Sequence, residues 1–598
     1  MNYKNIFITT TIFILISCTT VEVEKNINEV SFADQSPNAN IIFEEYLERE
    51  WQKRLKNNPL FATYTGDKRY NNKISSNSIE KYYKDKESDQ LSLNELQQID
   101  FANLSTENKL NYELKKFDLI NSINTKNFNT YYLRLNQRGG IQSFYETGNR
   151  LVYTSAKDYF DWLDRLKQFP DNINNSLKIN KMGLEKGYTQ PKLVTNGVIK
   201  QIDSIVNSQI EDNPYLKVFL NADENLLTPQ QKDLLIKEAK DLIVNQINPA
   251  YSELNEFLKN EYLPKSRNSI GIKHIPNGEE YYEYLAKYYT TTDLTPDEIH
   301  EIGLQEIKRI RSEMEIIITE LNWDGDFQSF LNYLRDSPRF YYENPNDLFN
   351  AYLVMSKTID PLLPKIFKEF PSTPYGVKPI PDETAPFTTT AYYNSPSPGR
   401  PGYFYANLYK PESRPKYEIP VLTVHEAVPG HHFQISIAQE LENVPEFRKY
   451  QSITAFIEGW GLYSEELGDY IGIYNDPYDK FGQLTYDMWR AIRLVVDTGM
   501  HYKDWSRDDA IKLFVENSAK SKLDIENEVD RYIAWPGQAL AYKIGQLKIM
   551  ELRDKAELKL GDKFDIKDFH YEVLKRGSLP LDLLEFYIEE WINESLNS

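Results

Sequence analysis

The chain has 598 residues, of which 40% are hydrophobic and 13% aromatic, and its 89 acidic and 69 basic side chains give a net charge of −20. This composition excludes a disordered protein, because so much apolar surface is enough for roughly two to four packed units. The strong negative charge excludes nucleic acid as a favourable partner, since phosphate groups would be repelled.

Residues 1–17 are predicted to be a signal peptide. A short basic start with Lys4 precedes an apolar run, Ile6 to Ile16, of about 11 residues, too short to span a membrane. The run ends in Leu15-Ile16-Ser17-Cys18, which resembles the lipobox of bacterial lipoproteins, and Cys18 is the only cysteine. We therefore expect an exported cell-envelope lipoprotein, lipidated at Cys18 and held to the membrane only by this anchor, through a polar tether over residues 18–37. Because Thr19 gives no inner-membrane retention signal, an outer-membrane, periplasm-facing position is favoured.

Helix-start signals dominate the rest of the chain. Thr228 and Thr295 each precede a proline, with Gln231 or Glu298 three residues after the threonine, and Ser506 is followed in the same way by Asp509. A hydroxyl cap with an acid or amide three residues later is typical of a helix N-terminus. Apolar residues then recur every three or four positions. The fold class predicted is mainly α.

Two exceptions to the helical pattern are visible. A change of composition at residues 264–278 predicts a boundary between an N-terminal helical lobe, 38–270, and a C-terminal catalytic lobe, 271–598. Between about 370 and 410, two β-leaning segments at 387–393 and 403–408 flank a loop rich in proline and glycine. We expect a hairpin or small sheet here, and residues 403–407 could be an edge strand that pairs with a substrate backbone.

Three of the seven histidines fall within His425 to His432, in the segment His425-Glu426-Ala427-Val428-Pro429-Gly430-His431-His432. Neutral imidazoles bind zinc, and an adjacent carboxylate can deprotonate zinc-bound water. On an ideal helix His431 would lie ~120° off the face of His425, and His432 would lie ~10 Å along the axis. The Pro-Gly pair can bulge the helix and return one of them. His431 is favoured as the second ligand, and His432 remains a rival.

A third ligand is expected on the next helix, predicted over residues 446–470. Glu458 lies there in an apolar, aromatic segment, where an unpaired carboxylate would be costly, so a cation is expected beside it. A catalytic zinc site usually has three protein ligands and an open fourth position. Glu465, on the same helical face, is a candidate to orient a ligating imidazole.

These segments together resemble a known family. HEAVPGHHFQ, FIEGWGLYSEELG, MWRAIRLVVDTGMHYKDWS (488–506) and EVDRYIAWPGQALAYKIGQLKIMELR (528–553) are similar to the bacterial domain-of-unknown-function 885 family, whose members are often lipoproteins and resemble gluzincin metallopeptidases. The resemblance implies a helical gluzincin-like metallopeptidase fold with a small sheet at the active-site cleft. It also implies one Zn²⁺ per chain, with His425 and a following histidine as ligands, Glu458 as the third ligand and Glu426 as general base.

Peptide hydrolysis also needs a second electrophile for the oxyanion. The candidates are His501, Arg531, Tyr532 and Tyr542, and Arg400 could bind a substrate carboxylate. His274, His300 and His570 stand alone in the sequence and are expected to be structural.

The main hypothesis is a lipid-anchored zinc metallopeptidase that hydrolyses small peptides. One alternative is a zinc amidase acting on another small amide or a cell-wall peptide, and a second is a binding lipoprotein without catalysis. The intact Glu426 and the lack of cysteine ligands favour catalysis over a structural zinc site.

Overall fold

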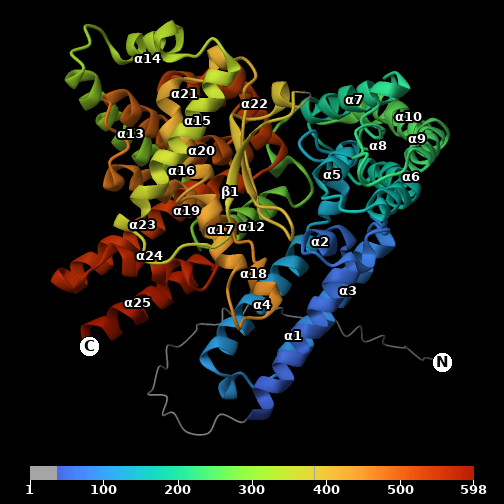
Figure 1. The fold of residues 1–598 in the computed structure, drawn as a ribbon, viewed down its shortest axis with the longest axis horizontal. Coiled ribbons are helices and arrows are strands. Elements are labelled where there is room, and N and C mark those ends of the chain that lie inside the picture. The colour runs from blue at the N-terminus through green and yellow to red at the C-terminus, as the bar shows by residue number, and fades with distance from the viewer. Residues whose placement is uncertain (1–36, 383, 598) are drawn as a thin grey trace, which may run out of the picture.

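The computed structural model describes residues 37–382 and 384–597. These residues form a mainly helical fold with one three-stranded sheet, which confirms the predicted class (Figure 1). The predicted signal peptide, Cys18 and residues 18–36 of the tether lie outside the described part. Among the described residues, no helix combines the length and the apolar character needed to cross a bilayer.

Four helices begin the described chain: α1 (Pro37–Asn57), α2 (Pro59–Tyr64), α3 (Ile79–Leu96) and α4 (Thr106–Asn127). Phe43 and Tyr46 of α1 belong to the same buried cluster as Leu584 and Ile588 near the C-terminus. The first helices of the chain therefore share a core with the last ones.

A second group of helices has its own core and lies to the right in Figure 1. It consists of α5 (Tyr145–Arg150), α6 (Ala156–Glu185), α7 (Lys192–Val206), α8 (Lys217–Leu220), α9 (Pro229–Leu242), α10 (Asn248–Phe257) and α11 (Leu263–Lys265). Trp162, Phe169 and Tyr251 fill this core, and the hydroxyl groups of Tyr215 and Tyr251 lie 2.6 Å apart within it. The separate core agrees with a helical unit that precedes the predicted boundary, which itself stays a prediction.

The remaining helices lie after residue 277. They are α12 (Gly278–Thr290), α13 (Pro296–Glu320), α14 (Phe327–Asp336), α15 (Pro345–Ile359), α16 (Ile419–Glu426), α17 (His431–Gln439), α18 (Glu446–Lys449), α19 (Thr454–Ile471), α20 (Pro477–Tyr502), α21 (Arg507–Asn517), α22 (Lys522–Ala534), α23 (Ala541–Leu560), α24 (Ile566–Leu574) and α25 (Leu581–Asn597). Helix α13 packs along α20, and α19 packs along α23. Helix α19 also contacts α16, α17 and α20, so it lies at the centre of the region that holds the histidine motif.

The predicted helix starts are confirmed. Thr228, Thr295 and Ser506 each cap a helix, with the reciprocal side-chain bond from the residue three positions later. The helix predicted over 446–470 is instead two helices, α18 and α19, because residues 450–453 leave the helical conformation.

The predicted hairpin is part of a sheet with strands β1 (Tyr375–Pro379), β2 (Ala391–Asn394) and β3 (Gly402–Ala406) in the order β1-β3-β2. Strands β2 and β3 pair antiparallel, as expected, and β1 adds a parallel strand on the other side of β3. The expectation that residues 403–407 form an edge for substrate is therefore wrong. Both edges of β3 already carry a strand, so its backbone groups are engaged within the sheet.

Candidate metal centre

The histidine motif spans two helices rather than one bulged helix. Helix α16 ends at Glu426 with all 8 of its residues buried, and α17 begins at His431. In the turn between them the Gly430 amide donates to the Val424 carbonyl oxygen over 2.9 Å. A Cβ atom at Gly430 would lie 2.0 Å from the His425 carbonyl oxygen, so this turn requires glycine. The break reverses the chain locally and returns His431 to His425.

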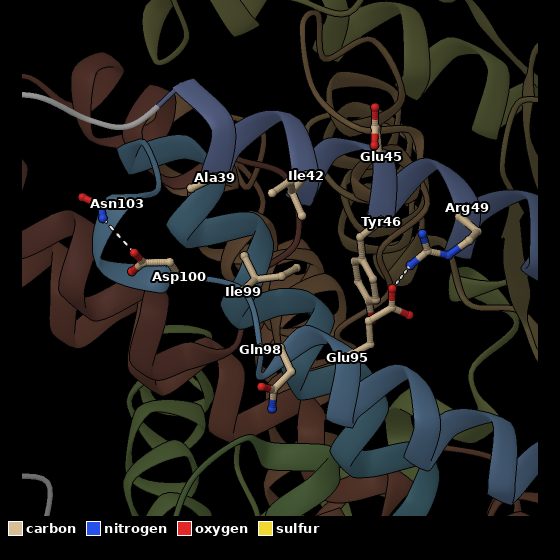
Figure 2. A pocket seen from close by; sticks show the side chains of 10 residues that line it. All are labelled: Ala39, Ile42, Glu45, Tyr46, Arg49, Glu95, Gln98, Ile99, Asp100 and Asn103. Atoms are coloured by element: carbon tan, nitrogen blue, oxygen red, sulfur yellow. Dashed lines mark hydrogen bonds and ion pairs between the residues drawn. The ribbon is translucent and has the colours of Figure 1, made fainter.

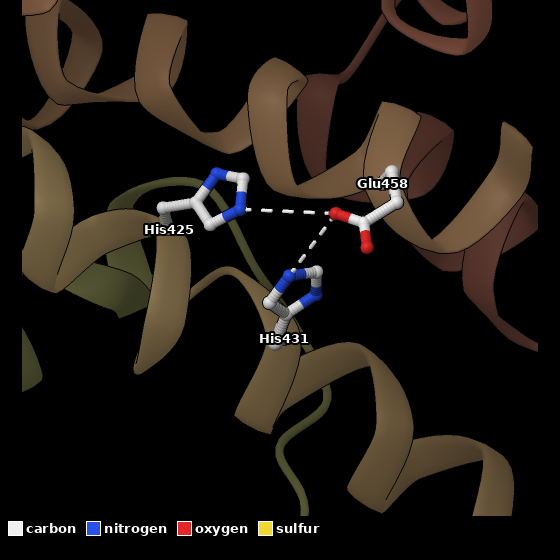
Figure 3. Close-up of side chains that lie close together, drawn as sticks. All are labelled: His425, His431 and Glu458. Atoms are coloured by element: carbon white, nitrogen blue, oxygen red, sulfur yellow. Dashed lines mark ion pairs between the residues drawn. The ribbon is translucent and has the colours of Figure 1, made fainter. Parts of the chain in front are cut away.

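His425, His431 and Glu458 converge from α16, α17 and α19, as Figure 3 shows. Nε2 of His431 lies 3.4 Å from Oε2 of Glu458, and Nε2 of His425 lies 3.9 Å from the same oxygen. One ligand atom from each residue falls within 4.8 Å of the other two. We call these three residues the His-His-Glu group; they are the set that the motif predicted.

Close packing of α19 positions the first imidazole. Gly461 lies one turn after Glu458 on α19, and a Cβ atom there would be 2.8 Å from Cε1 of His425. The absence of a side chain at this position allows the ring to lie directly against the helix backbone. The separation of His425 from Glu458 is thus set by backbone approach and not only by side-chain rotamers.

The three groups strongly affect one another's charge. Burial would raise the pKa of Glu458, but His431 and His425 outweigh it and lower the pKa to about 2. Burial lowers the pKa of His425 well below its ordinary value. Burial also disfavours charged His431, but Glu458 overcomes this effect and raises its pKa. An ionised carboxylate and a neutral imidazole are therefore held side by side.

The donor atoms of the group fit a zinc ion. Glu458 Oε2, the oxygen that faces Nε2 of both histidines, is buried and has no hydrogen-bond partner, although buried polar atoms nearly always have one. Two imidazole nitrogens and one carboxylate oxygen are a typical catalytic zinc set, which leaves a coordination position for a reactant. The Glu458 side chain is 18% exposed, so the group is not sealed from solvent.

Glu465 contacts the outer nitrogen of the first imidazole. Its Oε1 atom lies within ion-pair distance, 2.8 Å, of Nδ1 of His425, and neither atom makes a hydrogen bond in the described part of the chain. Arg490 of α20 approaches the same Glu465 oxygen at 3.3 Å. This arrangement matches the expectation that Glu465 orients a ligating imidazole, since a carboxylate on the outer nitrogen is a common support for metal-binding histidine.

Glu426 is the last residue of α16 and is buried next to the His-His-Glu group. Burial raises the pKa of Glu426 to about 7, with His431 opposing and Glu458 adding to the rise. A carboxyl group with a pKa near neutrality can both accept and return a proton at physiological pH. The Glu426 carboxyl group is thus close enough to His431 and Glu458 to interact with both electrostatically.

His432 points away from the group. Its Nδ1 lies 2.8 Å from the Tyr393 hydroxyl of β2, and its Nε2 lies 3.1 Å from the Thr373 carbonyl oxygen before β1. Both ring nitrogens are therefore occupied by residues of the sheet region. Of the two rival histidines, the structure brings only His431 to His425 and Glu458.

His501 is also remote from the chemistry expected of it. Its Nδ1 accepts a hydrogen bond of 3.0 Å from the Ile272 amide, and its Nε2 lies 2.9 Å from the Tyr532 carbonyl oxygen. Since main-chain groups use both nitrogens, His501 has no donor left for an oxyanion, and the expectation of that role is wrong. The isolated histidines His274, His300 and His570 likewise pair outside the group, with Asp504, Thr498 and Tyr463 respectively.

Tyr542 lies at the start of α23 and interacts electrostatically with Glu458. Its only hydrogen bond in the described part is a long one of 3.4 Å from Gln538, so its hydroxyl can donate to a ligand. Arg531 lies beyond Gln538 and is engaged by it at 2.8 Å and by Glu528 at 2.5 Å. Of these two oxyanion candidates, Tyr542 is thus the one that interacts with Glu458 and has a weakly engaged hydroxyl group.

Arg400 and Tyr532 have structural partners. The Arg400 guanidinium donates to the Ser395 carbonyl oxygen at 2.7 Å and to Asn394 at 3.1 Å, which braces the loop between β2 and β3. The Tyr532 hydroxyl accepts a 2.9 Å hydrogen bond from Arg493.

Arg490 and Arg493 of α20 are functional candidates that the sequence reasoning missed. Both side chains are buried, and both act on the charge of His425. They lie three residues apart, hence on one face, within an otherwise apolar stretch of helix. Two arginines on one face of a buried helix need acidic partners or a ligand, which is the signal that could have revealed them.

A cavity of about 430 Å³ lies elsewhere, between α1 and the chain that follows α3 (Figure 2). Four of its polar side chains pair with one another: Arg49 with Glu95, and Asn103 with Asp100 at 2.7 Å. None of the candidate site residues lines it, so it does not compete with the His-His-Glu group as the site of chemistry.

Comparisons with known proteins agree with this fold. A family model described as "Bacterial protein of unknown function (DUF885)" matches residues 59–588. The structure of a presumed lipoprotein from Colwellia psychrerythraea is similar, with a TM-score of 0.88 and 28% identity over 93% of this chain and 100% of that one. A presumed lipoprotein of unknown function from Shewanella oneidensis has the same fold, with a TM-score of 0.71 and 17% identity over 92% of this chain and 99% of that one. No curated protein matches the chain.

Proposed function

We propose that this chain, which belongs to the DUF885 family of bacterial proteins, is a zinc-dependent peptidase. The observation that carries the proposal is the convergence of His425, His431 and Glu458, with Glu426 beside them. A structural zinc site would normally have four protein ligands. Three ligands, partial exposure and an adjacent carboxyl group with a pKa near 7 favour hydrolysis instead.

His425 and His431 would hold the ion through Nε2, and Glu458 through a carboxylate oxygen, one ion per chain. Bound zinc would supply a Lewis acid that lowers the pKa of water and polarises a carbonyl group. Glu465 keeps the proton of His425 on Nδ1, so that Nε2 presents its lone pair to the centre.

Glu426 is proposed as the general base. Its carboxylate takes a proton from the attacking water and returns it to the leaving amine nitrogen, which completes the cleavage of the peptide bond. Proton transfer of this kind contributes about 10²- to 10⁴-fold to the rate. The burial that raises its pKa to about 7 makes both transfers feasible near neutral pH.

Tyr542 is proposed to stabilise the oxyanion of the tetrahedral intermediate by donating its hydroxyl proton into a hydrogen bond. Its closeness to Glu458 and its weakly engaged hydroxyl support this role. Arg531, with Gln538 between it and Tyr542, would add positive charge that favours the oxyanion from farther away. A hydrogen bond to Glu528 holds the Arg531 side chain in place.

The protein is further proposed to be a lipoprotein of the cell envelope, anchored through Cys18. The lipobox-like sequence supports this assignment, and both similar structures belong to proteins described as presumed lipoproteins. A peptidase tethered in this way would act on peptides that reach the periplasm-facing side of the outer membrane.

Incubation of the zinc-loaded protein with a mixed peptide library, followed by mass spectrometry of the products, tests the function. Cleaved peptide bonds that disappear on chelation and return with zinc are expected. Cuts at chain ends would identify an exopeptidase, and internal cuts an oligopeptidase. Intact peptides in the presence of stoichiometric bound zinc would refute the peptidase assignment.

A further inference from the structure

A group of arginines lies beside the proposed metal centre without enough acidic partners. Arg493 and Arg531 both bind Glu528, at 2.8 Å and 2.5 Å, and Arg138 from the chain before α5 interacts with the same carboxylate. We call Arg138, Arg493, Arg531 and Glu528 the arginine cluster. It brings three guanidinium groups to one carboxylate, so positive charge exceeds negative charge within it.

One hydrogen-bond donor of the arginine cluster has no partner. Arg493 donates through Nε to the Tyr532 hydroxyl and through Nη2 to Glu528, but its buried Nη1 has no partner. An unpaired, buried, charged donor is costly, and proteins rarely keep one without a function. An anionic group placed at Nη1 would supply both the missing hydrogen bond and the missing charge.

Nearby acids of the protein do not fill this role. Asp497 interacts with Arg531, but burial raises its pKa to about 7. Its Oδ1 accepts hydrogen bonds from Tyr282 at 2.6 Å and from the Gly537 amide at 2.9 Å, while its Oδ2 makes no hydrogen bond and so does not pair with Arg493. Glu458 belongs to the His-His-Glu group, where His431 is its first electrostatic partner. The partner of Arg493 Nη1 must therefore come from outside the chain.

The cluster adjoins the proposed reaction centre and also reaches solvent. The guanidinium carbon of Arg493 lies 4.3 Å from the centre of the Tyr542 ring, and both residues act on the charge of Glu458. At the other end, Arg138 is exposed. Asn136, two residues earlier, donates a 2.7 Å hydrogen bond to the Ala534 carbonyl oxygen and fixes this segment against the end of α22.

We propose that the arginine cluster binds a carboxylate group of the peptide substrate through Nη1 of Arg493, while Tyr542 and the His-His-Glu group act on the bond to be cleaved. The inference rests on the proposed peptidase function and specifies its substrate class: peptides that carry a carboxylate close to the scissile bond. That carboxylate is either the C-terminus of the peptide or an acidic side chain. Charge-assisted bonds from a planar guanidinium group suit either source.

Three related peptides distinguish these sources. The first has a free C-terminal carboxylate, and the second has the same sequence with a C-terminal amide. The third is the amide with a neutral residue next to the cleaved bond replaced by glutamate. The full-length zinc-loaded protein is assayed with each peptide, and the three kcat/KM values are compared with one another. At least a tenfold preference for the free acid over the amide identifies C-terminal recognition. A similar gain on adding glutamate to the amide identifies side-chain recognition. Equal rates for all three peptides overturn the proposal.

Arg493→Lys tests the residue, because lysine keeps the charge but lacks the planar fork. The preference for the carboxylate is expected to shrink to twofold or less. Arg165→Lys is the matched control, since Arg165 is also buried and hydrogen-bonded but lies in α6. It is expected to keep the full preference. An Arg493→Lys protein that melts like the parent and keeps the full preference would remove Arg493 from this role.

A binding measurement separates this inference from the proposed function. Fluorescence anisotropy of the labelled acid and amide peptides, with zinc-free protein, reports carboxylate recognition without any cleavage. Tighter binding of the acid by a protein that cleaves nothing would sustain the carboxylate site and reject the peptidase. Equal binding of the acid and amide peptides, together with their cleavage at the same rate, would sustain the peptidase and reject the carboxylate site.

Discussion

The Glu465 carboxylate lies 2.8 Å from Nδ1 of His425, while Nε2 of the same ring faces Glu458. Glu465 is almost fully buried, which raises its pKa to about 7. When ionised, the carboxylate acts on the imidazole with little screening. A carboxylate beside the outer ring nitrogen is a common support for a metal-binding histidine, and the contact limits the orientations open to the ring. The sequence places these residues on different helices, and the packing of α16 against α19 brings them together.

Glu465→Gln is expected to lower zinc affinity about ten- to a hundredfold, because the loss of the carboxylate weakens the basicity and orientation of His425. Competition with a chromophoric chelator measures the change. Glu466→Gln is the matched control: Glu466 is the next residue, is hydrogen-bonded to Gln483 at 3.1 Å and has no contact with the His-His-Glu group. Equal affinities of both variants and the parent would reject the supporting role of Glu465.

Glu426→Gln is expected to retain zinc and to lose hydrolysis by about 10²- to 10⁴-fold, since glutamine cannot accept the proton. Zinc per chain is measured by elemental analysis and cleavage by mass spectrometry of a peptide substrate. A variant with full zinc that still cleaves at the parental rate would exclude Glu426 as the base.

His431→Ala and His432→Ala are expected to behave differently. The first removes a nitrogen from the His-His-Glu group and should abolish stoichiometric zinc binding. The second should keep zinc but lower the free energy of unfolding by about 2 kcal/mol, because Tyr393 and Thr373 lose their partner. Zinc per chain and denaturant unfolding report the two effects. Loss of zinc only in His432→Ala would reverse the ligand assignment.

Gly461→Ala should weaken zinc binding even though no ligand changes. The new methyl group would lie 2.8 Å from the His425 ring, which must then move away from Glu458. The matched control is Gly139→Ala, since a Cβ atom at Gly139 meets nothing within 4 Å. A chelator competition assay on both variants checks the prediction, and parental affinity in Gly461→Ala would mean that the ring position is not limiting.

His501 is expected to make the protein sensitive to acid. Burial lowers its pKa from 6.5 to about 3 in the folded protein, so below pH 6.5 the unfolded chain binds a proton that the folded protein does not. Its stabilising contribution is therefore present above pH 6.5 and is lost as the pH falls toward 3, by about 1.4 kcal/mol per pH unit.

His501→Gln removes the group that binds this proton in the unfolded chain. The variant should be less stable at pH 7, because a hydrogen bond is lost, but its free energy of unfolding should fall less steeply than that of the parent between pH 6.5 and 4. Urea unfolding at a series of pH values gives both slopes. Identical slopes would show that His501 does not titrate as its burial implies.

The histidine motif shows which features of the site can be predicted from neighbouring residues in the sequence. It predicted the residue types of the proposed zinc site, and the capping residues at Thr228, Thr295 and Ser506 predicted where helices begin. These features depend on atoms within about one helical turn, so neighbouring residues encode them. By contrast, helical periodicity could not choose between His431 and His432, because the helix breaks at Glu426 and the spacing of an ideal helix no longer applies.

The sequence by itself determined a mainly helical chain, and it predicted the imidazole and carboxyl groups of the proposed zinc site. Only the tertiary structure decided that His431 turns towards His425 and that both ring nitrogens of His501 bond to main-chain groups. It also decided that β1 pairs with the second edge of β3, and that Arg493 lies beside Tyr542 with an unpaired hydrogen-bond donor. The physical reason is that each of these outcomes depends on contacts between segments far apart in the chain. Such contacts follow from how helices and strands pack, and no repeat or local motif records them.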